Sequence, residues 1–380
     1  MRALRWTVLV AALGLALPAV ALSAADPILI ATSLPMTGNS AFYGAQGRNG
    51  AALAVEEINA AGGVLGRPLQ DDVWDNRCNP AEGVCGITQA LAEKHYVAVH
   101  EGGCSSVALA VMPLVERATI PFVVGSPSAT SIARQSGVGG NTWTFKIIPT
   151  DDGMLSALVS WIAGKGEADR VAFIGEDTDY GRGGAASFDD AMKKQGKSLV
   201  EKDFYQQGTA DFGTLIARLK AAKPSLIAVY TIGADGQNFL RQWAEAGGGV
   251  GLTGRIFTDQ IPEQMLKSGV LDGLTTVHPY DVHIEDPANS DFVARYQKKF
   301  GNLPNLTSWI SYEGIEVIAD ALRKAGSTDP AKLRAALADG TYESMFGDPI
   351  RFDDHNLAHL PAFILGVRNG QVVVLGKSPT

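Results

Sequence analysis

One stretch, residues 97–130, sets the fold class that this chain can adopt. Two short apolar segments rich in valine, residues 97–100 and 120–124, enclose a segment of helical length rich in Ala, Leu, Val and Met. This spacing is typical of a parallel β-α-β unit, in which both strands end at the same edge of the sheet. Similar units occur along the whole chain, so we predict an α/β fold built on doubly wound parallel sheets.

Small hydroxyl residues follow both strands of this unit. Ser105 and Ser106 come after the first strand, and Ser128 and Thr130 come after the second. Ligands of open parallel sheets bind at the carboxyl ends of strands, where free backbone N–H groups and helix N-termini favour anions. The two loops together therefore predict a site for a small carboxylate. For either loop alone a second interpretation stays open, because serine also caps helices and Gly-Gly makes tight turns.

The N-terminus has the order of a secretory signal peptide. Basic residues precede an apolar segment without charge, residues 6–22, and small residues follow before Asp26. A membrane anchor is the alternative, but the apolar segment is short for a span and Pro18 interrupts it. We expect residues 1–25 to be removed and the product to be exported.

Net charge and cysteine content narrow the partners and the compartment. The formal charge of −8 becomes about −10 without the two arginines of the signal peptide, which argues against nucleic acid and anionic membranes as partners. An exported protein meets an oxidising compartment, so the three cysteines predict one disulfide and one free thiol. Cys78 and Cys104 both follow strand-like segments at the same end of the sheet, whereas Cys85 lies in a helical segment. We therefore expect a Cys78–Cys104 disulfide.

The pattern of the first half begins again after residue 148, and the length of the chain suggests two domains. The pair Tyr180-Gly181 repeats Tyr43-Gly44 directly after a predicted strand, which indicates two similar lobes. Neither of the glycine-containing segments around these two Tyr-Gly pairs has the glycine spacing of a nucleotide-binding site. The serines have no nucleophile elbow, and no cysteine or histidine spacing fits zinc. We expect no cofactor, no metal and no enzymatic activity.

Element boundaries are expected as follows. The helix after each Tyr-Gly pair is predicted to begin at about residue 49 in the first lobe and at about residue 185 in the second. Strands of the second lobe are predicted at residues 170–174, 226–230 and 255–258.

The motifs in their order resemble those of the Leu/Ile/Val-binding proteins, the type I periplasmic binding proteins of ABC transporters. The resemblance covers residues 27–377 and rests on segments that include Pro35-Met36-Thr37-Gly38, Gly103-Cys104-Ser105-Ser106, Ser126-Pro127-Ser128-Ala129-Thr130, Asp179-Tyr180-Gly181 and Gly326-Ser327-Thr328-Asp329-Pro330. It implies two α/β lobes that are joined by three hinge crossovers and close on a solute. The implied division is 1–25 for the signal peptide, 26–149 plus 279–365 for the first lobe, and 150–278 plus 366–380 for the second.

The resemblance also implies the ligand-binding residues. The solute carboxylate and α-amine are expected at Ser105, Ser128, Ala129 and Thr130, the cleft tyrosines at Tyr43 and Tyr180, and the disulfide at Cys78 and Cys104. The acidic partner of the solute ammonium falls on Gln260, with Asp259 beside it. A missing ammonium partner would suit an aromatic acid.

The function implied by the resemblance is that of a periplasmic solute-binding component of an ABC importer. Such a monomer would bind an amino acid of the branched-chain or aliphatic type between its lobes and pass it to a permease in the inner membrane. One alternative is a binding protein for aromatic carboxylates or amides, and another is a sensory receptor of the same fold. A secreted hydrolase is an alternative from a different class.

Overall fold

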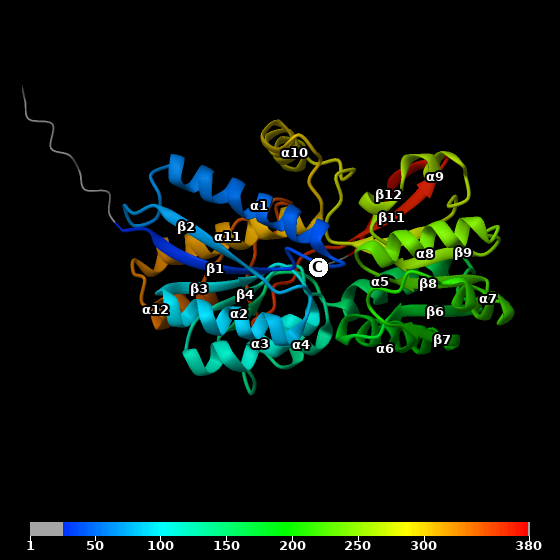
Figure 1. The fold of residues 1–380 in the computed structure, drawn as a ribbon, viewed down its shortest axis with the longest axis horizontal. Coiled ribbons are helices and arrows are strands. Elements are labelled where there is room, and N and C mark those ends of the chain that lie inside the picture. The colour runs from blue at the N-terminus through cyan, green and yellow to red at the C-terminus, as the bar shows by residue number, and fades with distance from the viewer. Residues whose placement is uncertain (1–25, 379–380) are drawn as a thin grey trace, which may run out of the picture.

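The computed structural model describes residues 26–378, which fold into two α/β lobes that lie side by side (Figure 1). The expected signal peptide, residues 1–25, lies outside the described part. Within residues 26–378 no helix is long and apolar enough to span a membrane. Two parallel sheets, one in each lobe, confirm the predicted fold class.

The first lobe is built on a parallel sheet of five strands in the order β2-β1-β3-β4-β5. Its strands are β1 (Ile28–Leu34), β2 (Leu69–Asp75), β3 (Tyr96–Glu101), β4 (Phe122–Val124) and β5 (Thr144–Lys146). Apolar side chains point to both faces, since Ile30 and Val123 belong to one core and Ala31 and Val124 to another. A sheet buried on both faces requires helices on both sides.

Helices cover the two faces of this sheet, as Figure 1 shows. On one face α1 (Ala41–Ala60) packs with α11 (Leu306–Ala325), which returns from the far end of the chain. On the other face lie α2 (Pro80–Glu93) and α3 (Ser105–Ala118). The remaining helices of this lobe are α4 (Thr130–Arg134), α10 (Pro287–Phe300) and α12 (Pro330–Asp339).

The second lobe repeats this plan on a parallel sheet of four strands in the order β7-β6-β8-β9. The strands are β6 (Val171–Glu176), β7 (Leu199–Tyr205), β8 (Leu226–Tyr230) and β9 (Gly251–Arg255). One core holds α5 (Asp151–Gly164) and α6 (Asp179–Lys194), and the other holds α7 (Gly213–Ala221) and α8 (Ala234–Glu245). The carboxyl ends of both sheets therefore carry loops that lead into helices.

An antiparallel sheet completes the second lobe. Its order is β10-β11-β12, with strands β10 (Thr275–His278), β11 (Phe363–Arg368) and β12 (Gln371–Lys377). The 3-10 turn η1 (Thr258–Gln260) and α9 (Glu263–Lys267) precede it. The boundary expected between residues 365 and 366 falls inside β11, and all of β11 pairs with its neighbours. The exact division of the chain between lobes stays a prediction.

Two helices begin earlier than the sequence predicts. α1 starts at Ala41 and α6 at Asp179, so each Tyr-Gly pair lies in a first helical turn and not in a loop. Glycine lowers helix propensity, which is why the helix starts were placed after it. Here glycine permits close packing, because a Cβ on Gly44 would lie 2.2 Å from Pro35 O and one on Gly181 2.0 Å from Glu176 O. Tertiary contact therefore outweighs propensity at both sites.

The disulfide between Cys78 and Cys104 is present, as predicted. Cys85 is free and exposed on α2. The bond links the turn after β2 to Cys104, which is the N-cap residue of α3. It therefore anchors the loop whose next residue, Ser105, is a predicted ligand contact.

Candidate functional site

A cavity between the two lobes collects residues of both serine loops. Its lining includes Ser105, Ser128, Glu176, Tyr180, Arg255 and Phe257, and we call it the smaller cavity. Its volume is about 30 Å³, which is about the share of one water molecule in the liquid. A solute of the size of an amino acid therefore requires the walls of this cavity to move apart.

A hydrogen bond holds the two serine loops together. Ala129 N donates to Ser105 Oγ at 3.3 Å, and the side chains of Ser105 and Ser128 are buried. Ser105 is the first residue of α3, where backbone N–H groups have no partner inside the helix. Hydroxyl groups and a helix N-terminus thus form one wall of the cavity, which is the chemistry that favours a carboxylate.

Thr130 has a partner within the protein. Its Oγ1 accepts a hydrogen bond from Asp152 N at 3.1 Å, in the first turn of α5. Nearby, Asp151 N donates to Ser128 O at 2.9 Å. These two bonds connect the loop after β4 to the first helix of the second lobe, so Thr130 and Ser128 lie where the lobes join.

The two predicted cleft tyrosines are buried and available as donors. Tyr43 in α1 and Tyr180 in α6 have phenol oxygens without a hydrogen-bond partner among residues 26–378. Burial raises the pKa of both phenols, so both stay neutral. The Tyr43 ring lies 5.1 Å from the Phe257 ring, centroid to centroid. Tyr180 therefore lines the smaller cavity from the second lobe, and Tyr43 of the first lobe packs against Phe257, which lines it.

Arg255 is a candidate that the sequence analysis missed. It is buried at the end of β9 and lines the smaller cavity. Its Nη1 lies 3.3 Å from Asp151 Oδ1, which also accepts a hydrogen bond from Tyr230 Oη at 2.6 Å. The Nε atom has no partner within the described chain. This buried guanidinium can donate to an anion in the cavity.

The prediction of a strand at residues 255–258 was wrong, and this error explains why Arg255 was missed. β9 spans Gly251–Arg255, and Thr258 already lies in η1. The two glycines of β9 hide the strand because glycine is depleted in strands. With the strand in its true place, an arginine at its carboxyl end would have been a signal for the site.

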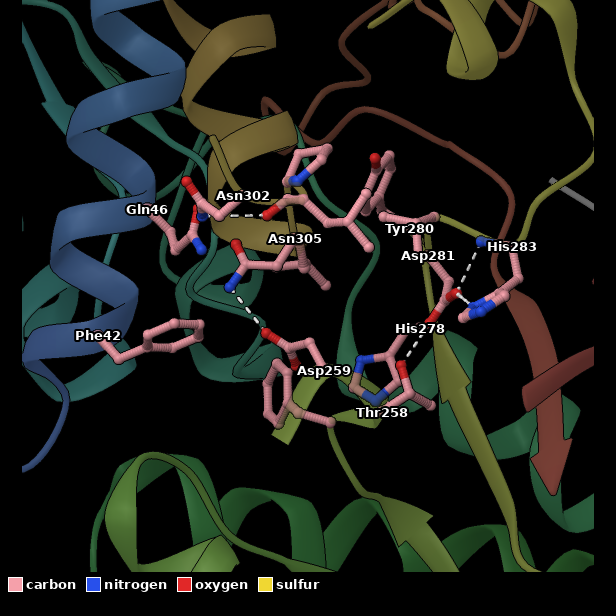
Figure 2. A pocket seen from close by; sticks show the side chains of 15 residues that line it. Phe42, Gln46, Thr258, Asp259, His278, Tyr280, Asp281, His283, Asn302 and Asn305 are labelled. Atoms are coloured by element: carbon pink, nitrogen blue, oxygen red, sulfur yellow. Dashed lines mark hydrogen bonds and ion pairs between the residues drawn. The ribbon is translucent and has the colours of Figure 1, made fainter. Parts of the chain in front are cut away.

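A larger cavity of about 300 Å³ lies beside the smaller one, and Phe257 lines both. Figure 2 shows that its walls come from both lobes; they include Phe42 and Gln46 of α1, Asp259 of η1, Asn305 at the start of α11, and Tyr280, Asp281 and His283 after β10. This volume is at the lower end of the range of ligand pockets, roughly 300–1,000 Å³. The larger cavity therefore has room for a small organic group.

Asp259 faces the larger cavity. Its Oδ2 accepts a hydrogen bond from Asn305 Nδ2 at 2.9 Å (Figure 2). Loss of water around the carboxyl group raises its pKa to about 6, although the Asn305 bond opposes the shift. Gln260 is buried, and its Oε1 lies 2.9 Å from the place that a Cβ on Gly236 would take. The two adjacent residues thus face different surroundings.

Among the other titratable side chains of the larger cavity, His278 and Asp281 have well-defined charge states. His278 Nε2 lies 3.0 Å from Ile256 O, and burial lowers the pKa of this histidine to about 3, which keeps it neutral. Although burial opposes it, hydrogen bonds from His283 and Thr258 lower the pKa of Asp281. Asp281 is therefore charged and already satisfied by its own neighbours.

The predicted site residues fall into four groups. Ser105, Ser128 and Tyr180 line the smaller cavity, Asp259 lines the larger one, and Tyr43 contacts the phenylalanine shared by both. The fourth group lines neither cavity: Ala129 and Thr130 support these walls through the hydrogen bonds described above, and Gln260 is buried. Glu176, Arg255 and Phe257 were not predicted. Glu176 had one signal in the sequence, an acidic residue at the end of an apolar strand.

Comparison with known proteins gives consistent matches over most of the chain. A family model described as periplasmic binding protein matches residues 27–371. The chain is 26% identical over 332 residues to the leucine-, isoleucine-, valine-, threonine-, and alanine-binding protein of Pseudomonas aeruginosa, with 87% of each chain covered.

Two solved structures have the same fold. The solute binding protein of an ABC transporter from Rhodopseudomonas palustris, in complex with 3,4-dihydroxy benzoic acid, is 25% identical with a TM-score of 0.82, covering 93% of this chain and 97% of that one. The branched-chain amino acid transporter substrate binding protein of Streptococcus pneumoniae, in complex with isoleucine, is 21% identical with a TM-score of 0.82, covering 93% of this chain and 99% of that one.

Proposed function

The chain belongs to the periplasmic binding protein family, and from this premise we propose that it is the solute-binding component of an ABC importer for an amino acid of the branched-chain or aliphatic type. It is a binding protein and not an enzyme. The name of the Pseudomonas aeruginosa relative supports the solute class. The observation that carries the proposal is the smaller cavity, where the serine loops of one lobe meet Tyr180 of the other.

The solute is bound in two parts. Its carboxylate accepts hydrogen bonds from Ser105 and Ser128, assisted by the N-terminus of α3. The phenol groups of Tyr43 and Tyr180 supply two further donors. The side chain extends past Phe257 into the larger cavity, whose apolar walls suit an aliphatic group. Two carboxyl groups are available for the ammonium, Asp259 in the larger cavity and Glu176 in the smaller one.

We further propose that the protein acts in the periplasm as a monomer, after removal of residues 1–25, and docks on a permease. Three crossovers near residues 149, 278 and 365 would divide the chain into the two lobes. The two separate sets of apolar cores, one on each parallel sheet, support this division. Light scattering coupled to size exclusion tests the monomeric state.

A second candidate solute is an aromatic carboxylate without an amine. The observation that favours it is Arg255, a buried cation in the wall of the smaller cavity whose Nε has no hydrogen-bond partner among residues 26–378. The Rhodopseudomonas palustris structure with 3,4-dihydroxy benzoic acid supports the same chemistry. The two candidate solutes differ in one group, the ammonium. A test of which solutes stabilise the protein distinguishes between them.

A thermal-shift screen tests the proposal. Leucine, isoleucine and valine are compared with benzoate and 3,4-dihydroxybenzoate, because a bound solute raises the melting temperature with its concentration. Ser105→Ala is expected to weaken binding of the best solute by about 10- to 100-fold, the usual value of a hydrogen bond to a charged group. Ser290→Ala on the exposed face of α10 is the control. Stabilisation by aromatic acids alone would exclude the amino-acid proposal.

A further inference from the structure

Glu176 ends β6 and places a carboxyl group in the wall of the smaller cavity, on the opposite lobe from Ser105. The residue is 2% exposed, and its Oε1 has no hydrogen-bond partner among the described residues. Buried polar atoms in folded proteins nearly always have a partner. An unpartnered carboxyl oxygen in a cavity wall therefore points to a group that the solute itself would supply.

The titratable neighbours of Glu176 on its own lobe are acidic or phenolic, and hydrogen bonding to the uncharged side chains of Thr178 and Gln207 partly opposes the effect of burial on its pKa. Asp235, in the first turn of α8, carries the same sign of charge, and its Oδ2 accepts a hydrogen bond from Gly208 N at 2.9 Å. Tyr205 of β7 and Tyr180 of α6 are buried phenols, and the charge of Glu176 contributes, after burial, to their raised pKa values. These three neighbours thus provide no positive charge to balance a carboxylate at this position.

Arg255 of β9 is the cation that lines the same cavity. Its guanidinium is paired with Asp151 at 3.3 Å, on the side of α5. Burial and then the charge of Asp235 raise the pKa of Glu176 to about 8. At neutral pH the carboxyl group therefore holds a proton in the structure described here, and a cation bound beside it would favour the charged form.

We propose that Glu176 accepts the ammonium group of the amino-acid solute and so selects for an α-amine. The inference rests on the proposed function, which it deepens by naming the residue that recognises the amine. Glu176 lines the same small cavity as the hydroxyls expected to bind the carboxylate, as an α-amino acid requires for groups that share one carbon atom. Asp259 instead lines the larger cavity and is already bonded to Asn305.

Proton balance follows from this assignment. The Glu176 carboxyl group loses its proton to the solvent when the solute binds, and the resulting carboxylate pairs with the ammonium, which keeps its three protons. Binding of an amino acid at pH 7 therefore releases close to one proton. Binding of the same molecule without its amino group releases none from this residue.

Calorimetric titration of the mature protein tests this with two matched solutes, L-leucine and 4-methylpentanoate, which is leucine without its amino group. Titrations at pH 7 in phosphate and in Tris buffer report proton release, because the two buffers differ in ionisation enthalpy. We expect a buffer-dependent enthalpy for leucine alone. Glu176→Gln is expected to weaken leucine by about 10- to 100-fold and to leave 4-methylpentanoate unchanged.

The control is Asp177→Asn, because Asp177 is the next residue and pairs with Arg182 on the surface. The assignment would be overturned if Glu176→Gln bound leucine with wild-type affinity. It would also be overturned if Asp259→Asn, and not Glu176→Gln, lost leucine binding. The buffer comparison uses the wild-type protein and so does not depend on how the variant folds. If the binding enthalpy of leucine were the same in both buffers, the assignment of Glu176 would also be contradicted. The wild-type titration alone decides the proposed function: a protein that binds 4-methylpentanoate but no amino acid overturns both.

Discussion

Asn305 donates a hydrogen bond from Nδ2 to Asp259 Oδ2 at 2.9 Å and so joins the start of α11 in the first lobe to the turn after β9 in the second. A second contact joins the lobes through backbone atoms, since Ala234 N donates to Asn39 O at 3.2 Å. Both contacts lie on the loops that surround the cavities. These bonds hold the lobes in a closed arrangement, and we expect a solute to enter when they open.

The backbone contact at Asn39 gives a test of closure. A Cβ on Gly233 would lie 2.5 Å from Asn39 O, so Gly233→Ala prevents the lobes from approaching as closely. We expect solute affinity to fall by at least about tenfold, which corresponds to roughly 1.4 kcal/mol. We also expect small-angle scattering to give a larger radius of gyration for the variant in the presence of solute.

Gly196→Ala is the matched control for backbone strain. Gly196 has a φ of 71°, close to the 69° of Gly233, and a Cβ there would meet no atom within 4 Å. Both variants therefore place alanine at a positive φ. Gly233 also has a ψ of −149°, outside the left-handed helical region, so Gly196→Ala reproduces the positive φ of Gly233→Ala without its clash between lobes. Equal effects of the two variants would mean that strain, and not closure, determines the affinity.

The Cys78–Cys104 disulfide is expected to stabilise the fold through the unfolded state. The bond closes a loop with a sequence separation of 26 residues, for which the chain-entropy model gives roughly 3.5 kcal/mol. A Cys78→Ser/Cys104→Ser double variant should lose about this much free energy of unfolding in urea titrations. Cys85→Ser removes an exposed free thiol and is the control. A double variant as stable as the control would contradict the expectation.

Burial of Glu101 at the end of β3 is expected to make the stability of the fold depend on pH. It is fully buried, and its Oε1 accepts hydrogen bonds from Gly103 N at 2.9 Å and Cys104 N at 3.1 Å. Burial outweighs these bonds and raises the pKa from 4.5 to about 8. The folded protein therefore binds a proton between pH 4.5 and pH 8 that the unfolded chain does not.

The sign of the effect follows from this difference. The stabilising contribution is full below pH 4.5 and is lost as the pH rises through 8, with a slope of up to about 1.4 kcal/mol per pH unit. Glu101→Gln, which cannot titrate, should flatten the dependence of unfolding free energy on pH by that amount. Urea titrations from pH 5 to pH 8 measure it, with exposed Glu167→Gln as control. Parallel curves for wild type and Glu101→Gln would contradict the assignment.

The sequence predicts those parts of the structure that depend on local pattern. The strand 226–230 and the disulfide depend on apolar periodicity and on the position of residues at strand ends, and both are found. The starts of α1 and α6 were placed too late because glycine propensity is local, whereas the contacts that favour glycine there come from the preceding strands.

The candidate site was harder to predict, because its cavities form between elements far apart in the chain. Ser105 and Ser128 were identifiable, since they follow adjacent strands of one β-α-β unit. Arg255 was not, because the glycine-containing strand before it gives no apolar run. The contact between Asp259 and Asn305 depends on how two lobes pack, and no spacing in the sequence determines that.

Phe257 separates the two cavities and so affects which solutes fit. It lines both of them, and its ring lies 5.1 Å from Tyr43 and 4.7 Å from His278, centroid to centroid. Phe257→Ala would join the cavities into one space that packs poorly around an aliphatic side chain. A misfit of one methylene group in an apolar pocket costs about 1–3 kcal/mol.

We therefore expect Phe257→Ala to change the ratio of the dissociation constants for leucine and phenylalanine by about tenfold or more in favour of phenylalanine. Calorimetric titration of both amino acids measures the ratio, after circular dichroism has shown that the variant is folded, because truncation of a buried phenylalanine costs about 3–5 kcal/mol of stability. Phe42→Ala is the comparison, since Phe42 lines the larger cavity and is 48% exposed. Phe42→Ala enlarges the larger cavity at its solvent side but leaves Phe257 between the two cavities. It should therefore change the affinities for leucine and phenylalanine by similar factors. If Phe257→Ala weakens both amino acids equally, the ring stabilises the lobe interface and does not select the side chain.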